Sequence, residues 1–349
     1  MAYKLLILGA SYGSLLGTRL ALAGHDVTLV CLPEEVELFN AEGARIRLKP
    51  RGYADFIELN SAAGPGLLDA CGPDDADVDA YDMVGLAMQE PQYRAETVRN
   101  LLARVAAARK PAVSIMNMPP LPFLARVAPG AVDKLRAAFT DPSVWDGFEP
   151  GLVTLASPDP QAMRPPGEPL NVLQVNLPTN FKVAAFENPE HTAMLRQMQA
   201  DIEAYRHGPE DIELPVKLKV FDSLFVPLAK WAMLVTGNYR CITEGEPISI
   251  KDAVHGDVEL SGRIYQAVCD LCVRLGASPN DMVPFQKYAN AAESLIRPSS
   301  AARALAGGAP FIERLDKVAA ALAESQGIDI PTLAGTAALV DAKLAANRM

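Results

Sequence analysis

A glycine-containing turn near the start of the chain has the composition of a nucleotide-binding turn. It lies at residues 9–13, between the apolar run YKLLIL and the segment SLLGTRLALAG, which has helical spacing. In such a strand–turn–helix unit, glycines let the backbone approach a pyrophosphate, which rests on the N-terminus of the helix. The usual G-x-G-x-x-G spacing is altered here, and a turn without a ligand is the alternative. The candidate cofactor-binding residues of this turn are Gly9, Ser11, Tyr12, Gly13 and Ser14.

The same residues spell G-x-S-x-G, the pattern of a hydrolase nucleophile elbow. Such an elbow follows a strand in the middle of the sheet, well into the chain, and an acid and then a histidine must come after it. Ser11 instead follows the first apolar strand. Its position therefore favours the cofactor-binding interpretation.

The end of the second apolar strand offers the next contact for a dinucleotide. The sequence VCLPEE places Leu32 at the strand end, with Glu34 and Glu35 just beyond it. A carboxylate about 20 residues after the glycine turn binds the ribose hydroxyl of NAD, whereas an arginine favours the 2′-phosphate of NADP. Two carboxylates with no nearby cation would repel that phosphate, which slightly favours NAD over NADP. Alternatively, both glutamates are solvated charges at the start of a helix.

The composition is that of a globular protein with more than one domain. The chain has 349 residues, of which 50% are hydrophobic, and its net charge is −10. Nucleic acid and anionic membranes are recognised by clustered Lys and Arg, so the charge argues against both as partners. No apolar run reaches the length of a membrane span. Because the first residues do not have the pattern of a secretory signal, we expect a cytoplasmic protein.

The cysteines and histidines do not indicate a metal centre. Cys269 and Cys272 form a C-x-x-C pair inside a helical pattern, but no second Cys or His pair stands at zinc spacing. The five cysteines are scattered and the four histidines are isolated. We therefore expect reduced, buried thiols and no bound metal.

The chain divides into two regions with different patterns of apolar residues. Up to residue 188, apolar strands alternate with helices, which is typical of a parallel sheet covered by helices. From residue 189 to 349, helical periodicity dominates. The sequence thus predicts an α/β protein with a Rossmann-like domain (1–188) and an all-helical domain (189–349). Strands are expected at residues 3–9, 26–32, 82–88 and 112–118, with edge strands at 170–177 and 181–187.

The order of these segments resembles that of the ketopantoate reductases. The stretch LILGASYGSLLGTRLALAGHDVTLVCL is similar to the family's N-terminus, and SIMNMPP is similar to its strand that ends in Gln-Asn-Gly. The stretch FVPLAKWAMLVTGN resembles the helix with the catalytic lysine, and SSAARALAGGAP resembles the Ser-Ser-x-x-Arg-Asp segment. ALAESQGIDIPTLAGTAALV resembles the closing helix and turn. Together these motifs span nearly the whole chain.

The resemblance implies a Rossmann domain joined to a helical domain of the 6-phosphogluconate dehydrogenase C-terminal type, which often forms a homodimer. It also implies hydride transfer from NADPH to a 2-keto group. Lys230 would then protonate the alkoxide that hydride transfer leaves, and Asn117 would hold the substrate or the nicotinamide ribose. The other implied residues are Asn238 beside the lysine, Ser299, Ser300 and Glu313 for the substrate, and Leu32 and Gln89 for the cofactor phosphate.

Several positions depart from the family pattern. Leu32 and Gln89 stand where an arginine and a lysine hold the 2′-phosphate. Leu234 replaces an asparagine, although Asn238 lies one turn further along the same face of a regular helix as Lys230. The substrate-binding glutamate is also displaced, with Glu313 out of register. These departures point away from ketopantoate as the substrate and away from dependence on NADP.

Lys230 itself has two other interpretations. It is also the kind of lysine that snorkels from an amphipathic helix to solvent. In a second registration of the family motif, Met233 would take the catalytic position. We prefer Lys230 because Lys230-Trp231 matches the Lys-Trp pair of one subgroup directly.

These observations predict an NAD(P)-dependent oxidoreductase that acts on a small 2-keto, 2-hydroxy or related carbonyl compound. One alternative is a protein of the same fold that has lost redox turnover and binds a ligand. Another is a non-redox isomerase or lyase with Lys230 as its base. Failure to bind either nicotinamide would favour the first alternative, and product formation without cofactor would favour the second.

Overall fold

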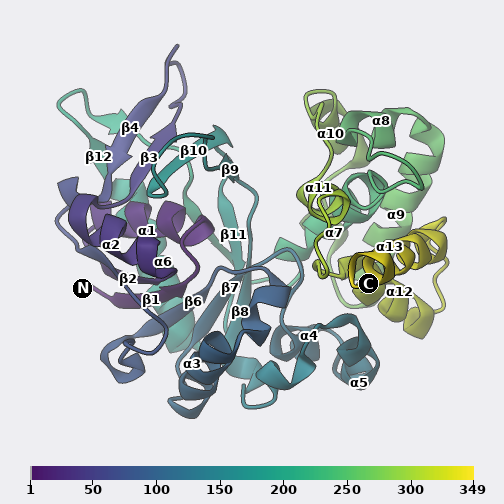
Figure 1. Ribbon diagram of the computed structural model, residues 1–349, viewed down its shortest axis with the longest axis horizontal. Coiled ribbons are helices and arrows are strands. Elements are labelled where there is room, and N and C mark those ends of the chain that lie inside the picture. The colour runs from purple at the N-terminus through teal and green to yellow at the C-terminus, as the bar shows by residue number, and fades with distance from the viewer. Residues whose placement is uncertain (1) are drawn as a thin grey trace. The chain divides into compact units, whose positions relative to one another are not determined.

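The chain forms two compact units and crosses between them more than once. Figure 1 shows the computed structural model, which describes residues 2–349. Unit 1 comprises Met1–Met88, Gln92–Met116 and Val144–Asp222. Unit 2 comprises Gln89–Pro91, Asn117–Ser143 and Ser223–Met349. The main division lies after Asp222, later in the chain than the boundary at residues 188/189 that the sequence predicted.

Unit 1 is built on an eight-stranded sheet with the order β14-β11-β8-β7-β6-β1-β2-β5. The strands from β8 to β5 run parallel to one another, and β11 is antiparallel to β8. The fold class that the sequence predicted is confirmed. The strands are β1 (Lys4–Leu8), β2 (Asp26–Val30), β5 (Leu68–Cys71), β6 (Met83–Leu86), β7 (Ala112–Ile115), β8 (Val153–Ser157), β11 (Phe181–Ala184) and β14 (Leu218–Phe221).

The direction of the chain changes at β1, and this positions the glycine turn. From β1 the chain passes through α1 (Tyr12–Leu22) to β2 on one side, whereas β6 pairs with the other side of β1. The step from β6 through α3 (Glu96–Ala107) to β7 runs the opposite way. Right-handed crossovers then place α1 and α3 on opposite faces of the sheet (Figure 1). In open α/β sheets, ligands bind at such a switch point, beyond the carboxyl ends of the strands.

One of the two expected edge strands lies in a different sheet. β10 (Val172–Leu177) pairs with β3 (Arg45–Leu48) in a four-stranded sheet of order β4-β3-β10-β9. Its last two residues are exposed, so it does not have the two covered faces of a strand in the main sheet. β4 (Ile57–Asn60) and β9 (Gln161–Met163) complete this second sheet. β11 does join the main sheet, but it lies inside β14 instead of at the edge.

The segment after residue 188 begins with a helix that packs in unit 1. α6 (Pro189–Ala204) contacts α1 and β14, and its buried positions include Leu195 and Ile202. The hairpin β12 (Arg206–His207) and β13 (Ile212–Glu213) follows, and then β14. The expectation of an all-helical region from residue 189 was therefore wrong as far as residue 221, because Leu218–Phe221 pairs with β11 as a strand. Unit 1 also contains α2 (Pro33–Glu42), which follows β2.

Unit 2 is helical. The sequence predicted this for the residues after 222, whereas it placed residues 117–143, which also belong to unit 2, in the Rossmann-like domain. α9 (Val258–Arg274) shows the pattern clearly, because Ile264, Val268, Leu271 and Cys272 are buried along one stripe. α7 (Lys230–Met233) continues as a π-helix over Leu234–Asn238. The other helices are α4 (Leu121–Val127), α5 (Val132–Leu135), α8 (Ile250–His255), α10 (Phe285–Ala292), α11 (Ser300–Ala306), α12 (Leu315–Gln326) and α13 (Leu333–Asn347).

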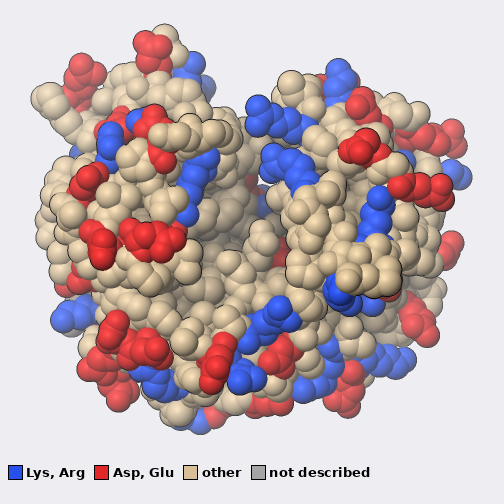
Figure 2. All heavy atoms as spheres, viewed as in Figure 1, with Lys and Arg blue, Asp and Glu red and all other residues tan. Residues whose placement is uncertain are grey.

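The surface carries charges of both signs. Figure 2 shows Lys and Arg interspersed with Asp and Glu on the viewed face, without a large basic patch there. Among residues 2–349, no helix has both the length and the apolar character that crossing a membrane requires.

Gly9→Ala tests the steric requirement at the glycine turn. Gly9 has φ of +104°, and a Cβ there would lie 2.9 Å from the carbonyl oxygen of Ala87. We expect a loss of about 1–3 kcal/mol in unfolding free energy from the strained backbone, with the clash added to it. The control is Gly167→Ala, at φ of +80° with nothing within 4 Å of the added Cβ. Urea unfolding of both variants should show the larger loss for Gly9→Ala; equal losses would contradict this account.

Candidate functional site

The glycine turn of unit 1 brings α1 close to the sheet. The Gly9 N–H donates to the Val30 carbonyl oxygen at 2.9 Å, which extends the pairing of β1 with β2 into the turn between β1 and α1. A Cβ at Gly13 would lie 2.9 Å from Cγ2 of Ile7, so the first turn of α1 packs directly on β1. Despite the altered spacing, Gly9 and Gly13 thus perform two of the steric functions of a Rossmann glycine motif, the tight turn and the close helix packing.

The N-terminus of α1 fits an anionic group. Ser11 precedes the helix and is exposed, but its side chain makes no capping hydrogen bond, and the first turn contains no acidic residue. Backbone N–H groups at such a terminus, together with the helix dipole, attract a pyrophosphate. The hydroxyl of Ser14 is buried and donates to the Ser11 carbonyl oxygen at 2.9 Å. It therefore stabilises the turn and is already engaged within the chain.

Tyr12 is directed to other parts of unit 1. Its hydroxyl donates to the Pro160 carbonyl oxygen at 2.9 Å, and its ring meets the Phe181 ring edge to face at 6.4 Å between centroids. The ring is half-buried. These contacts attach the segment before β9 to the first turn of α1.

A cation lies at the end of β2, where the sequence indicated none. Arg164 pairs with the carboxylate of Glu35, whose other oxygen accepts the Leu32 N–H at 3.0 Å. Glu35 is buried, whereas Glu34 is exposed and the exposed fraction of Leu32 is 60%. The argument that no cation stands near these glutamates was therefore wrong, because Arg164 comes 129 residues after Glu35. The preference for NAD drawn from it loses its basis.

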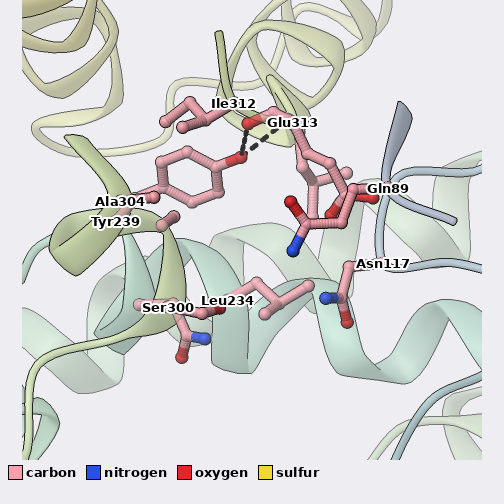
Figure 3. Close-up of a pocket in the computed structure, with 11 residues that line it drawn as sticks. Gln89, Asn117, Leu234, Tyr239, Ser300, Ala304, Ile312 and Glu313 are labelled. Atoms are coloured by element: carbon pink, nitrogen blue, oxygen red, sulfur yellow. Dashed lines mark hydrogen bonds between the residues drawn. The ribbon is translucent and has the colours of Figure 1, made fainter. Parts of the chain in front are cut away.

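The second candidate region is a pocket in unit 2 (Figure 3). Two of its polar residues, Gln89 and Asn117, come just after β6 and β7, which are neighbouring parallel strands. Its empty volume, including the open mouth, is about 450 Å³. Figure 3 shows the side chains of Gln89, Asn117 and Glu313 close together in this pocket. The lining residues are Gln89, Asn117, Leu234, Asn238, Tyr239, Ser300, Ala301, Ala304, Ile312, Glu313 and Leu315.

Glu313 supplies a carboxyl group to the pocket lining. Its Oε1 accepts the Glu90 N–H at 3.4 Å, and its carboxyl group also accepts a hydrogen bond from the Asn117 side chain. Burial raises the pKa of Glu313 to about 7; the Glu90 charge raises it too, whereas the hydrogen bonds and the Lys230 charge lower it. A carboxyl group with this pKa exchanges its proton near neutral pH, as a general acid or base must.

Asn117, which lines the same pocket as Glu313, has a side-chain oxygen that accepts no hydrogen bond within the described residues. Its amide group donates to Glu313, and its Oδ1 is buried without a hydrogen-bond partner among the described residues. A buried acceptor is normally satisfied, so Oδ1 indicates a donor that comes from a ligand or a water molecule. The expectation that Asn117 holds the substrate or the nicotinamide ribose stays a prediction.

Glu90 is a second buried carboxylate beside Glu313. Its oxygens accept the backbone N–H and the hydroxyl of Thr140, both at 2.8 Å. Burial raises the pKa of Glu90, and the bonds from Thr140 oppose this. Sequence reasoning did not single out Glu90, although it stands next to Gln89 after a buried strand. That position was the available signal.

Lys230 is connected to the pocket through charge. It begins α7 and is not itself a lining residue, but its ammonium is close enough to lower the pKa of Glu313. Asn238 lines the pocket, separated from Lys230 by the π-helical segment. The expected placement of both residues on one helical face assumed a regular α-helix, so its geometric basis was wrong.

Two tyrosines stabilise this part of unit 2. The hydroxyl of Tyr288 donates to the Met233 carbonyl oxygen at 3.1 Å, and a Cβ at Gly237 would lie 2.0 Å from that hydroxyl. Tyr239 donates to the Glu313 carbonyl oxygen at 2.5 Å and accepts the Leu315 N–H at 2.9 Å (Figure 3). Gly237 thus admits Tyr288 into the helix, and Tyr239 fixes the backbone that carries Glu313. No sequence signal identified either tyrosine.

The two serines assigned to a substrate carboxylate differ. The Ser299 hydroxyl donates to the Asn238 carbonyl oxygen at 2.7 Å and accepts the Ala302 N–H at 3.1 Å. Ser299 is therefore a helix cap that holds Asn238 in place, and its expected role as a substrate ligand stays a prediction. Ser300 does line the pocket.

The thiols do not form a reactive centre. The described part of the chain contains no group of three His, Cys, Asp or Glu residues that could hold a metal ion. All five cysteines are free, and burial raises the pKa of each. His25 is buried, where its Nδ1 accepts the Tyr3 N–H and its Nε2 approaches Asp201. It holds the start of β2 in place.

Solved structures match the chain over nearly its whole length. The 2-dehydropantoate 2-reductase of Methylococcus capsulatus matches with a TM-score of 0.69 at 15% identity and covers 99% of this chain and 98% of its own. D-mandelate dehydrogenase, in a ternary structure with NADH and anilino(oxo)acetate, matches with 0.65 at 13% identity, covering 99% and 100%. The dimeric ketopantoate reductase of Staphylococcus aureus matches with 0.60 at 11% identity, covering 99% of both chains.

These matches establish the fold. No family model matches the sequence. No curated protein matches it either. The chain has the fold of the ketopantoate reductases, and the resemblance seen in the sequence motifs is confirmed at this level. Because one fold supports several chemistries, function is argued below from the site.

Glu313→Gln tests the shifted pKa. The pKa of Glu313 in the folded chain, about 7, lies above its ordinary value of 4.5. The folded state therefore holds a proton that the unfolded state loses, and stability falls as pH rises from about 4.5 through 7, by about 3 kcal/mol. Urea unfolding between pH 4 and 8 should show this fall in the wild type and not in Glu313→Gln. The exposed Glu324 serves as the control, and Glu324→Gln should keep the wild-type profile. Parallel profiles for wild type and Glu313→Gln would contradict the assignment.

Proposed function

We propose that the protein is an NAD(P)-dependent oxidoreductase that interconverts a small carbonyl compound and the corresponding hydroxy compound. Unit 1 supplies a glycine turn and an uncapped helix N-terminus that fit a pyrophosphate. Unit 2 supplies a pocket with a proton-exchanging carboxyl group. The observation that carries the proposal is the cluster of Lys230, Glu313 and Asn117, in which Asn117 Oδ1 still lacks a donor.

In unit 2, Lys230 donates the proton to the substrate and Glu313 can reprotonate the lysine. When bound, a nicotinamide would supply or accept the hydride at the carbonyl carbon. When hydride adds, the carbonyl oxygen takes a proton from the Lys230 ammonium, and the neutral amine is then reprotonated from solvent or by protonated Glu313. In the oxidative direction the same groups accept the hydroxyl proton. Asn117 Oδ1 accepts a hydrogen bond from a hydroxyl of the substrate or of the nicotinamide ribose.

The pocket lining narrows the substrate class. It offers the amides of Gln89, Asn117 and Asn238, the hydroxyl of Ser300 and the carboxyl of Glu313. Among the described residues, no Lys or Arg belongs to this lining. Such a lining suits hydroxyl and carbonyl groups on a small 2-keto, 2-hydroxy or related compound. Because Glu313 stands out of register with the family glutamate and Ser299 is engaged as a cap, we propose a substrate other than ketopantoate.

Lys230→Ala is the direct test of the proposal. Removal of the ammonium should lower turnover roughly a hundredfold or more, because the alkoxide loses its proton donor. Binding of reduced nicotinamide, followed by its fluorescence, should be unchanged. The exposed Lys287 of the same unit provides the control, and Lys287→Ala should retain activity. The assay follows nicotinamide absorbance with a panel of 2-keto and 2-hydroxy compounds.

The alternatives predict different outcomes of this assay. No binding of either nicotinamide would point to a protein that has lost redox turnover. Product formation without added cofactor, lost in Lys230→Ala, would point to an isomerase or lyase. Full turnover in Lys230→Ala would contradict the role of the lysine.

We also propose a cytoplasmic homodimer. A similar fold is described as dimeric in Staphylococcus aureus. The five free cysteines agree with a reducing compartment. Light scattering coupled to gel filtration should give about twice the chain mass of 37.3 kDa, and a monomer at micromolar concentration would contradict the dimer.

A further inference from the structure

The turn between β2 and α2 carries an ion pair whose two members come from distant parts of unit 1. Glu35 lies in the first turn of α2, and Arg164 follows β9. The exposed side-chain fraction is 7% for Glu35 and 31% for Arg164. Both charges influence the buried thiol of Cys31, the residue directly after β2. The pair is therefore at the carboxyl end of β2. In a Rossmann fold, residues at this position contact the 2′-hydroxyl or 2′-phosphate of the adenosine ribose.

Glu35 is not available to hold a ribose. One of its oxygens accepts the Leu32 N–H at 3.0 Å and the other accepts Arg164. A carboxylate that recognises the 2′-hydroxyl of NAD needs an oxygen that the ligand can reach. Glu35 instead caps α2 and acts as the counter-ion of Arg164.

Arg164 is held in place by the elements around it. β9 pairs with β10 in the register Gln174↔Met163, so the residue before Arg164 belongs to a sheet. The carbonyl oxygen of Pro160, at the other end of β9, accepts the hydroxyl of Tyr12. β9 is thus fixed both to the first turn of α1 and to the start of α2, which border the expected positions of the pyrophosphate and the ribose.

We propose that Arg164 binds the 2′-phosphate of NADP(H), with Glu35 as its positioning residue, and that the chain therefore prefers NADP(H) to NAD(H). This inference rests on the proposed function. A guanidinium has five N–H donors in a planar fork; Glu35 accepts from one terminal nitrogen, and the group is partly exposed. The arginine supplies the cation that the family places at Leu32. Without it, Glu34 and Glu35 would repel the phosphate.

The test measures binding, so it does not depend on finding the substrate. Calorimetric titrations of the intact protein use NADPH, NADH, adenosine 2′,5′-bisphosphate and 5′-AMP. The variants are Arg164→Gln, Arg164→Lys and the control Arg196→Gln, which removes an exposed arginine of α6 that pairs with Asp222. Circular dichroism and thermal melting check that each variant folds.

We expect the wild type to bind NADPH and the bisphosphate roughly ten- to a hundredfold more tightly than NADH and 5′-AMP. Arg164→Gln should lose this difference with NADH affinity unchanged, Arg164→Lys should keep part of it, and Arg196→Gln should keep all of it. If Arg164→Gln does not fold, the inference is tested by comparing the NADPH-over-NADH affinity difference of Arg164→Lys with that of the wild type.

Two results would overturn the inference while leaving the proposed function intact. One is equal or tighter binding of NADH by the wild type. The other is a preference for NADPH that both Arg164 variants retain in full. Failure to bind either dinucleotide would instead contradict the proposed function itself.

Discussion

The acid–base chemistry that the pocket of unit 2 can support depends on the burial of one carboxyl group, that of Glu313. Moving a carboxylate out of water is costly unless neighbouring groups compensate, and the chain compensates only in part for Glu313. The Glu90 N–H, the Asn117 amide and the Lys230 charge favour the ionised form, while burial and the Glu90 charge oppose it. The balance leaves a group that changes its charge near neutral pH. A fully compensated carboxylate would stay ionised and could not exchange a proton there.

A second constraint, in unit 1, is purely steric. The backbone of Gly9 approaches the Ala87 carbonyl so closely that no side chain fits, and Gly13 lies against Ile7. These two positions preserve the turn although the spacing of the motif has changed. A nucleotide-binding turn is thus specified by where backbone must pass closely, and a pattern of letters captures this only approximately.

Much of the fold could be predicted from local patterns. Continuous apolar runs indicated β1, β2, β6 and β7, because strands buried on both faces need them. The partner of β10 and the position of α6 in unit 1 could not be predicted, because pairing between segments distant in the chain leaves no local mark. The pairing of Arg164 with Glu35 could not be predicted for the same reason.

The candidate site was predicted in part. Asn117, Asn238, Ser300 and Glu313, which the family resemblance assigned to the site, line one pocket, and the roles assigned to them stay predictions. The roles of Glu90 and Tyr239 could not be read from the sequence, because their importance comes from what they contact and not from their type. The π-helix could not be predicted from the sequence either. Over only nine residues, one wider turn leaves no recognisable change in the helical pattern of apolar residues.

That wider turn makes the site sensitive to chain length. The Tyr239 N–H donates to the Leu234 carbonyl oxygen, five residues back, so this turn holds one residue more than an α-helical turn. Loss of one residue between 234 and 238 would restore ordinary helical spacing and rotate everything before it, Lys230 included, by about 100° relative to Tyr239. Exchanges of side chains here leave the register intact. Insertions and deletions do not, so the placement of Lys230 relative to Tyr239 depends on the length of this segment.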